Sequence, residues 1–320
     1  MMRGLSRNGW VLGLVGLLIL LLIVTKLIQP SFGASGLESV TRAALPFAFA
    51  TAATAVVVIA GGIDLSVAAM MAVVGVTAAV LMEGAGVTQT WLVVLAVLAL
   101  GAAMGALNGA LVVATRLPDI VVTLAMSFVW EGVALLILKA PGGAATPWLR
   151  EVILGPIAPG PVVSLIPKSL VVLAVLLMLV WLPLRRSRLG LSIYAIGSDA
   201  TAAFRSGVSI GATRVAAYAI AGVLVAMGGL SVTLSTGIGE PIPGPYLLAA
   251  VAAVVLGGVV LGGGRGGLLG PIVAVFILRI VRLDLTLLSV DPNVTTIVEG
   301  TIMAVVVMLG GILAVRGRRA

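Results

Sequence analysis

The chain of 320 residues contains no histidine and no cysteine. Their absence excludes disulfide bonds, thiolate or imidazole metal sites and histidine-activated nucleophiles, so we expect no metal site and no catalytic residue. Only three lysines are present, Lys26, Lys139 and Lys168, and none of them follows a glycine. A phosphate loop of the GxxxxGK[ST] type is therefore absent, and the sequence predicts neither a nucleotide site nor a cofactor in this chain.

Charged residues are also scarce, at 9% of the chain, whereas hydrophobic residues make up 61%. Soluble domains have roughly 25% charged and 45–50% apolar residues. Together with a mean hydropathy of +1.28, these values predict an all-α, polytopic membrane protein. In so apolar a chain, we attribute the net charge of +8 to basic cytoplasmic loops and not to nucleic-acid binding.

Apolar runs divide the chain into about ten candidate transmembrane helices of a single transmembrane domain, residues 1–320, although nine or eleven also fit. The runs are 10–28, 43–60, 67–83, 91–114, 120–138, 169–183, 214–236, 247–264, 267–283 and 294–314. The first run follows Arg3 and Arg7 and resembles a signal peptide. We interpret it as an uncleaved span, because it is long and no small-residue cleavage motif follows it.

The basic residues predict the orientation. If the N-terminus is cytoplasmic, 12 of the 19 basic residues lie inside: Arg3, Arg7, Arg116, Arg185, Arg186, Arg188, Arg205, Arg214, Arg265, Arg316, Arg318 and Arg319. This bias favours a cytoplasmic N-terminus and C-terminus, in agreement with an even number of spans.

Two segments between the spans are long. The first, 139–168, is rich in Gly and Pro and is expected outside the cytoplasm, with WLREVIL (148–154) as a possible interfacial helix. The second, 184–214, is expected inside. Ser198 or Asp199 is suited to cap a short helix over 200–206, and Gly207 is suited to end it. That helix either lies on anionic lipid or docks to a cytoplasmic partner.

A possible pathway segment is Gly61-Gly62-Ile63-Asp64-Leu65-Ser66. The double glycine predicts a broken helix, Ser66 is suited to cap the next one, and Asp64 is favoured by that helix's dipole. The alternative is a tight cytoplasmic turn. Ionisable groups are rare at membrane depth and usually mark a transport pathway. We therefore take Gly61, Gly62, Asp64 and Ser66 as pathway candidates.

Polar residues within other spans are Asn108, Glu131 and Glu299. Such residues commonly make interhelical hydrogen bonds, and we add Asn108 and Glu299 to the pathway candidates. The glycine-rich stretch 255–271 predicts a closely packed helix pair that turns at Arg265. Its structural glycines are Gly257, Gly258, Gly263, Gly264 and Gly266.

Four ordered motifs resemble the permeases of ribose-type ABC importers, over about residues 10–314. They are Gly61 to Ser66 (family pattern GGIDLS), Leu107 to Leu124, Arg188 to Val208, and Ala252 to Gly266 (family pattern AAVVLGG…GGRG). The resemblance implies an inner-membrane permease subunit that passes a monosaccharide or similar polar small molecule by alternating access.

The resemblance also implies partners. They are an external substrate-binding protein, a second permease subunit and an ATPase that would bind ATP and Mg. In the branch that the chain resembles, the two ATPase cassettes are commonly fused in one polypeptide. Segment 188–208 would be the element that couples to the ATPase. Its matching residues are Arg188, Gly190, Tyr194, Gly197, Ala202, Ala203, Arg205, Ser206 and Gly207.

Departures from the family pattern leave some points open. The carboxylates that often precede AAVVLGG are absent from the run Pro245 to Val251, and Leu191 replaces an arginine. A heterodimer with a different permease is therefore as compatible with the sequence as a homodimer. The functional alternatives are an ion-coupled secondary transporter, for which Asp64 and Glu299 would be candidates, and a channel. A membrane enzyme would need clustered acids, bases or metal ligands, which the sequence scarcely offers.

Overall fold

The structure is a computed structural model that describes residues 2–155 and 166–317. Within these ranges the chain is helical, without strands, and has one isolated β-bridge between Gly142 and Gly239. The helices are α1 (Met2–Ile28), α2 (Ala34–Ile59), α3 (Val67–Met82), α4 (Val87–Thr115), α5 (Asp119–Ile137), α6 (Pro147–Leu154), α7 (Lys168–Arg186), α8 (Arg188–Ser198), α9 (Ala200–Arg205), α10 (Ile210–Thr236), α11 (Tyr246–Leu256), α12 (Leu269–Leu287) and α13 (Pro292–Gly317).

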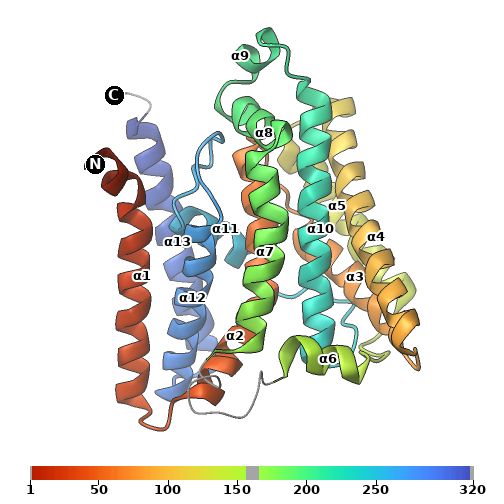
Figure 1. The fold of residues 1–320 in the computed structure, drawn as a ribbon, viewed down its shortest axis with the longest axis vertical. Helices are drawn as coiled ribbons and strands as arrows, with labels where there is room; N and C mark the ends of the chain where they lie inside the picture. Colours follow the sequence, from red (N-terminus) through yellow and green to blue (C-terminus); the bar gives the residue numbers. More distant parts are fainter. Residues whose placement is uncertain (1, 156–165, 318–320) are drawn as a thin grey trace.

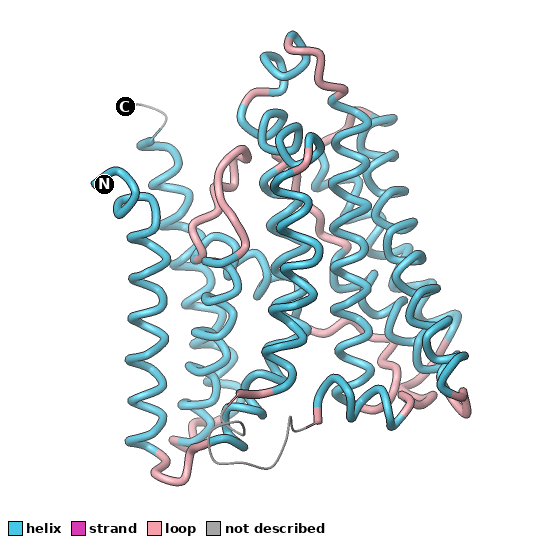
Figure 2. Tube along the Cα trace, viewed as in Figure 1, coloured by secondary structure: helices cyan, strands magenta, loops and turns pink. Residues whose placement is uncertain are grey.

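The long helices run roughly side by side between two ends of the molecule (Figure 1). Both termini, α8 and α9 lie at one end, which we call the α9 end. The short helix α6 lies across the opposite end, which we call the α6 end. In Figure 2 the loops gather mainly at these two ends, apart from a long loop between α11 and α12 that reaches toward the α9 end.

Six helices are long and apolar enough to cross a membrane: α1, α2, α4, α5, α7 and α10. Helices α3 and α11 are equally apolar but have only 16 and 11 residues. At 1.5 Å per residue they reach about 24 and 16 Å, less than the roughly 30 Å of a bilayer core. Each therefore extends through only part of the bilayer and depends on the irregular segment beside it to complete the crossing.

The centre of the fold is α2, in which every residue from Ala44 to Ile59 is buried. Helix α10 packs against α2, α3 and, most extensively, α4. At the crossing of α4 and α10, a methyl group on Gly105 would overlap the backbone of Tyr218, and one on Gly222 would overlap Gly101. These glycines allow the two backbones to approach closely, which is how helices associate where no water drives them together.

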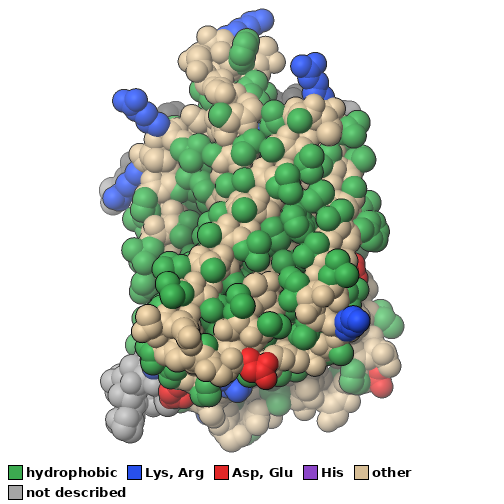
Figure 3. Space-filling model, turned by 90° about the vertical axis from the view of Figure 1, so that its right-hand side faces the viewer, with side chains coloured by type: hydrophobic (Ala, Val, Ile, Leu, Met, Phe, Trp, Pro, Cys, Tyr) green, Lys and Arg blue, Asp and Glu red, His purple; other side chains and the backbone are tan. Residues whose placement is uncertain are grey.

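The outer surface is mainly apolar. In Figure 3 hydrophobic side chains cover the middle of the visible face, and most charged side chains lie toward the two ends. Exposed Leu, Ile, Val and Phe side chains occur along α1, α4, α5 and α7. A soluble monomer rarely exposes so wide an apolar surface, so this band is the part that contacts lipid.

Each of the ten expected spans overlaps a helix, but three details were wrong. The second span begins at Ala34 instead of residue 43, because its polar first turns are helical and stabilised by a salt bridge from Arg42 to Glu38 (2.6 Å). Residues 257–264, expected within a span, form a loop, because Gly258, Gly263 and Gly264 adopt positive φ, which a helix does not allow. Residues 188–198, interpreted as loop, form α8.

Candidate functional site

The segment between α2 and α3 is a true break in the helical path. Gly61 has φ +84°, a conformation that side chains disfavour, and its N–H still bonds to the Val58 carbonyl. At Gly62, an added methyl group would come within 2.5 Å of Asp119 Oδ2 and 3.0 Å of Tyr218 Oη. The double glycine therefore serves two purposes, since Gly61 turns the chain and Gly62 leaves room for polar side chains.

Asp64 lies in this break and is fully buried. Its Oδ1 accepts hydrogen bonds from the Ser66 N–H (2.8 Å) and the Ser66 hydroxyl (2.6 Å). The expected roles are thus exchanged: the Ser66 hydroxyl makes no capping bond to the helix, and Asp64 accepts from one backbone N–H at the start of α3, that of Ser66.

The network continues from Ser66 into two other helices. Asn108 of α4 donates from Nδ2 to Ser66 Oγ (2.7 Å), and Trp130 of α5 donates from Nε1 to Asn108 Oδ1 (3.2 Å). Ser66 and Asn108 are fully buried. The structure thus brings together Gly61, Gly62, Asp64, Ser66 and Asn108, five of the six pathway candidates. We call Asp64, Ser66, Asn108 and Trp130 the Asp64 cluster.

A second group of polar residues joins the same break to α5 and α10. Thr123 accepts from the Leu65 N–H (3.0 Å), and Tyr218 donates to Asp119 Oδ2 (3.1 Å). Arg214 Nη1 lies 3.7 Å from Asp119 Oδ1. We did not select these residues from the sequence. The spacing of Asp119 and Thr123, one helical turn apart in a matched motif, was the available signal.

One atom of the Asp64 cluster is unsatisfied. Within the part of the chain that the structure describes, Asp64 Oδ2 is buried without a hydrogen-bond partner. Buried polar atoms are nearly always paired, and leaving a group unpaired costs about 1–3 kcal/mol, more when it is charged. Oδ2 is therefore the atom of the cluster that is available to a further donor.

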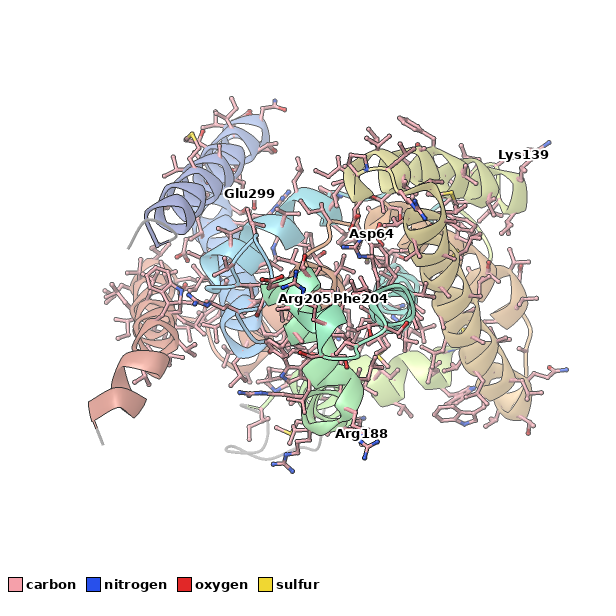
Figure 4. The ribbon with its side chains drawn as sticks, turned by 90° about the horizontal axis from the view of Figure 1, so that it is seen from above. Asp64, Lys139, Arg188, Phe204, Arg205 and Glu299 are labelled. Carbon is pink, nitrogen blue, oxygen red and sulfur yellow. The ribbon has the colours of Figure 1, made fainter. Side chains whose placement is uncertain are left out.

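Glu299, the sixth pathway candidate, lies elsewhere (Figure 4). It belongs to α13 and pairs with two arginines of α12, at 3.4 Å from Arg279 Nη2 and 2.9 Å from Arg282 Nη1. The Arg279 guanidinium also stacks over the Phe47 ring at 4.0 Å. These contacts neutralise Glu299 and join α12, α13 and α2, as a structural ion pair does.

The candidate coupling residues occupy α8, α9 and the turn that follows. Ser187 caps α8 by accepting from the Gly190 N–H (3.0 Å), and a methyl group on Gly190 would overlap the Leu184 carbonyl. Tyr194 donates its hydroxyl to the Gly266 carbonyl (2.8 Å). Burial raises the pKa of Tyr194, an effect that nearby Arg185 only partly opposes, so the hydroxyl remains a donor.

Helix α9 matches the short helix expected over 200–206. Asp199 caps it by accepting from the Ala202 N–H (2.9 Å), and Gly207 ends it with φ +83°. Ala203 is buried, whereas Phe204 is 68% exposed. Seen from the α9 end in Figure 4, Phe204 and Arg205 lie over the middle of the molecule and Arg188 lies toward its edge. An exposed aromatic side chain beside arginines is suited to a docking surface.

The five structural glycines all lie in the loop between α11 and α12. Four of them have positive φ: Gly258, Gly263, Gly264 and Gly266. At Gly257 an added methyl group would overlap Pro271 of α12. The expected turn at Arg265 is thus a longer loop, and its glycines also contact α8 and the break between α2 and α3.

At the other end of α3, a shallow groove separates α3 and α10 from the segment 237–246. Its lining includes Ala72, Gly75, Thr233, Glu240 and Tyr246. Thr233 of α10 donates to the Gly75 carbonyl of α3 (3.0 Å), which joins the two helices on one side of the groove. Small and hydroxyl-bearing side chains and one carboxylate thus occupy the part of the bundle that leads from the α6 end along α3.

A bundle of apolar helices with a broken helix at a buried carboxylate is an arrangement that membrane transport proteins use. The chain belongs to the family described as the branched-chain amino acid transport system permease component, which matches residues 36–307. This assignment confirms the resemblance seen in the motifs. The chain is a permease subunit of an ABC importer and not itself an enzyme.

Two curated relatives illustrate the family. The ribose import permease protein RbsC of Escherichia coli (strain K12) is 30% identical over 300 residues, which covers 92% of both chains. The autoinducer 2 import system permease protein LsrD of the same strain is 28% identical over 322 residues, which covers 94% of this chain and 92% of LsrD. No solved structure matches. In general, the permease of an ABC importer works with an ATPase and a binding protein.

Proposed function

We propose that this chain, with a second permease subunit, forms the pathway of an inner-membrane importer for a monosaccharide or a similar polar small molecule. The names of the two relatives, which import ribose and autoinducer 2, support this substrate class. Hydroxyl and amide groups near α3, those of Ser66, Asn108 and Thr233, support it as well, because such groups suit an uncharged solute. An external binding protein would supply the specificity, so the pathway itself needs only weak contacts.

The observation that carries the proposal is the projection of α9. This six-residue helix stands beyond the ends of the long helices (Figure 1). It presents Phe204 to solvent and has Arg205 in its last turn. Nothing in the described chain covers it, although burying one Phe side chain stabilises a contact by about 1.5–3 kcal/mol. We assign α9 as the element that docks into the ATPase, with α8 as its base, so that 184–214 is the coupling loop.

The charge distribution supports an orientation with the α9 end in the cytoplasm. Arg185, Arg186, Arg188 and Arg205 lie on α7, α8 and α9 at that end. Acidic residues are more frequent toward the α6 end, where the loops contain Glu83 and Asp291. By the positive-inside rule, both termini would then be cytoplasmic, and segment 139–168, including α6, would face the binding protein.

The mechanism follows from these assignments. The ATPase subunit, with its two cassettes separate or fused in one polypeptide, would bind ATP and Mg. This chain would bind neither. Closure of the ATPase would move α9, and docking of the loaded binding protein would act on the α6 end. The transmembrane dimer would respond to both by shifting between two states, each open to one side. The Asp64 cluster lies at the junction of α3, α4 and α5 and is the proposed moving part of the pathway.

The test is uptake by proteoliposomes that contain this chain, its second permease, the ATPase and the binding protein. Radiolabelled ribose is the first probe, and a panel of unlabelled monosaccharides, amino acids and nucleosides competes with it. We expect uptake that needs ATP and the binding protein and that monosaccharides inhibit. Inhibition by amino acids alone would contradict the substrate class.

The buried carboxylate of Asp64 favours a second candidate, an ion-coupled secondary transporter, because such transporters use intramembrane acids. The same vesicles distinguish the two. Uptake that persists with a protonophore and stops without ATP supports the ABC importer. Uptake that a protonophore abolishes while ATP is supplied supports ion coupling.

A further inference from the structure

Three segments far apart in the sequence meet at one point beneath α9. They are the C-terminal end of α8 (197–198), the end of α2 and its break (59–61), and the loop between α11 and α12 (263–266). The Gly264 N–H donates to the Ile59 carbonyl (2.9 Å), which joins the break to the loop. Tyr194 donates to the Gly266 carbonyl (2.8 Å), which joins α8 to the same loop.

Gly197 is the residue at which all three segments touch. A methyl group on Gly197 would overlap the Ile59 carbonyl oxygen and would lie 2.6 Å from the Gly264 nitrogen. From the opposite side, a methyl group on Gly263 would lie 2.8 Å from the Gly61 Cα and 3.0 Å from the Gly197 Cα. The backbones are therefore in direct contact, with no side chain between them.

Direct backbone contact matters for transmitting motion. A flexible side chain between two segments can change rotamer and absorb a small displacement, whereas a close-packed contact cannot. Only two residues, Ser198 and Asp199, separate Gly197 from the first residue of α9. The link between α9 and Gly197 is therefore short, so a displacement of α9 acts close to Gly197.

The two segments that Gly197 touches lead to different halves of the bundle. Through Gly61 the break leads to Asp64 and α3. Through Gly263 and Gly264 the loop leads to α11 and α12. In the described part of the chain, α3 and α11 are the two apolar helices that have too few residues to cross a bilayer core alone. Both are thus within reach of the same contact.

We propose that Gly197 is the positioning residue that makes both interrupted helices move together when α9 is displaced. This inference rests on the proposed function, because it assumes that the ATPase displaces α9. It concerns a step inside this chain, namely how one displacement at the surface acts on two separate parts of the pathway.

The absence of cysteine permits a test that does not depend on the transported solute. A single cysteine replaces Ala72 in α3 or, in a second protein, Val251 in α11. Each is introduced into the complete complex with its ATPase. The rate of labelling by N-ethylmaleimide is then compared without nucleotide and with the ATPase trapped by ATP and vanadate.

With Gly197 intact, we expect trapping to change both labelling rates by about fivefold or more, the range of ordinary allosteric coupling. In Gly197→Ala both changes should fall below about twofold, while the ATPase still copurifies. Tyr194→Phe, which removes one hydrogen bond to the loop after α11 and leaves the packing intact, should weaken the response at Val251→Cys more than at Ala72→Cys. The matched control is Gly132→Ala, because Gly132 has open space around it.

If Gly197→Ala fails to assemble, the labelling response of Tyr194→Phe tests the inference instead. A full response at both cysteines in Tyr194→Phe, or in an assembled Gly197→Ala, would overturn the inference. A parent protein that retains Gly197 and shows no nucleotide response, or no bound ATPase, would overturn the proposed function itself, and the inference with it. The two failures are therefore distinguishable.

Discussion

Replacement of Asp64 separates its structural role from its role in transport. In Asp64→Ala, the Ser66 N–H and hydroxyl lose their common acceptor inside a fully buried site. Each unsatisfied donor costs about 1–3 kcal/mol, but the substitution also removes the unpaired Asp64 Oδ2, so we expect a net loss of about 1–3 kcal/mol. In Asp64→Asn, an amide oxygen still accepts from Ser66, so the loss falls below about 1 kcal/mol.

The assay measures both roles in one preparation. Thermal unfolding in detergent and the amount of copurified ATPase report on structure, and ATP-dependent uptake reports on transport. We expect Asp64→Asn to assemble like the parent protein but to lose most of its uptake, whereas Asp64→Ala loses both. Thermal stability equal to the parent in Asp64→Ala would refute the role at the start of α3. Full uptake in Asp64→Asn would refute the pathway role and favour a simple turn.

Further variants test the other assignments. Arg205→Glu and Gly207→Val should each reduce ATPase copurification several-fold, by reversed charge and by strain at positive φ, without affecting membrane insertion; normal recovery with both would contradict the coupling assignment. Gly222→Val should destabilise the protein by about 1–3 kcal/mol, because a larger side chain overlaps Gly101; an unchanged melting temperature would contradict close packing there. Glu299→Gln should lower stability, since it leaves buried Arg279 partly unpaired, yet keep uptake per assembled complex; selective loss of uptake would return Glu299 to the pathway.

The sequence was sufficient for the fold class and for most helices, because long apolar runs have few alternatives in a membrane. Short helices were predicted well where capping chemistry is explicit, as for α9 with Asp199 before it and Gly207 after it. Helix α8 was missed because its glycines and its position between basic residues suggested a loop. Its helical state depends on packing against Leu184 and Gly266, which are contacts that a local pattern does not contain.

The candidate site was predictable in part for the same reason. The motif at Gly61 to Ser66 and the single Asn108 were selected as polar groups in apolar sequence. In the structure they are in contact, through the hydrogen bond from Asn108 to Ser66. Glu299 had the same signal in the sequence but is neutralised by Arg279 and Arg282 from the neighbouring helix. Which buried charge is paired and which is left open depends on tertiary contacts, and so does the meeting of Gly61, Gly197 and Gly263.

The central claim is that α9 docks to an ATPase, and copurification tests it most directly. The chain is purified from its native membrane in mild detergent, with and without a crosslinker, and the associated proteins are identified by mass spectrometry. The account predicts an ATPase with Walker motifs that is lost in Arg205→Glu; a second, different permease in the same sample would establish a heterodimer. Recovery of the chain without any ATPase, across several detergents and with the crosslinker, would contradict the claim that α9 docks to an ATPase.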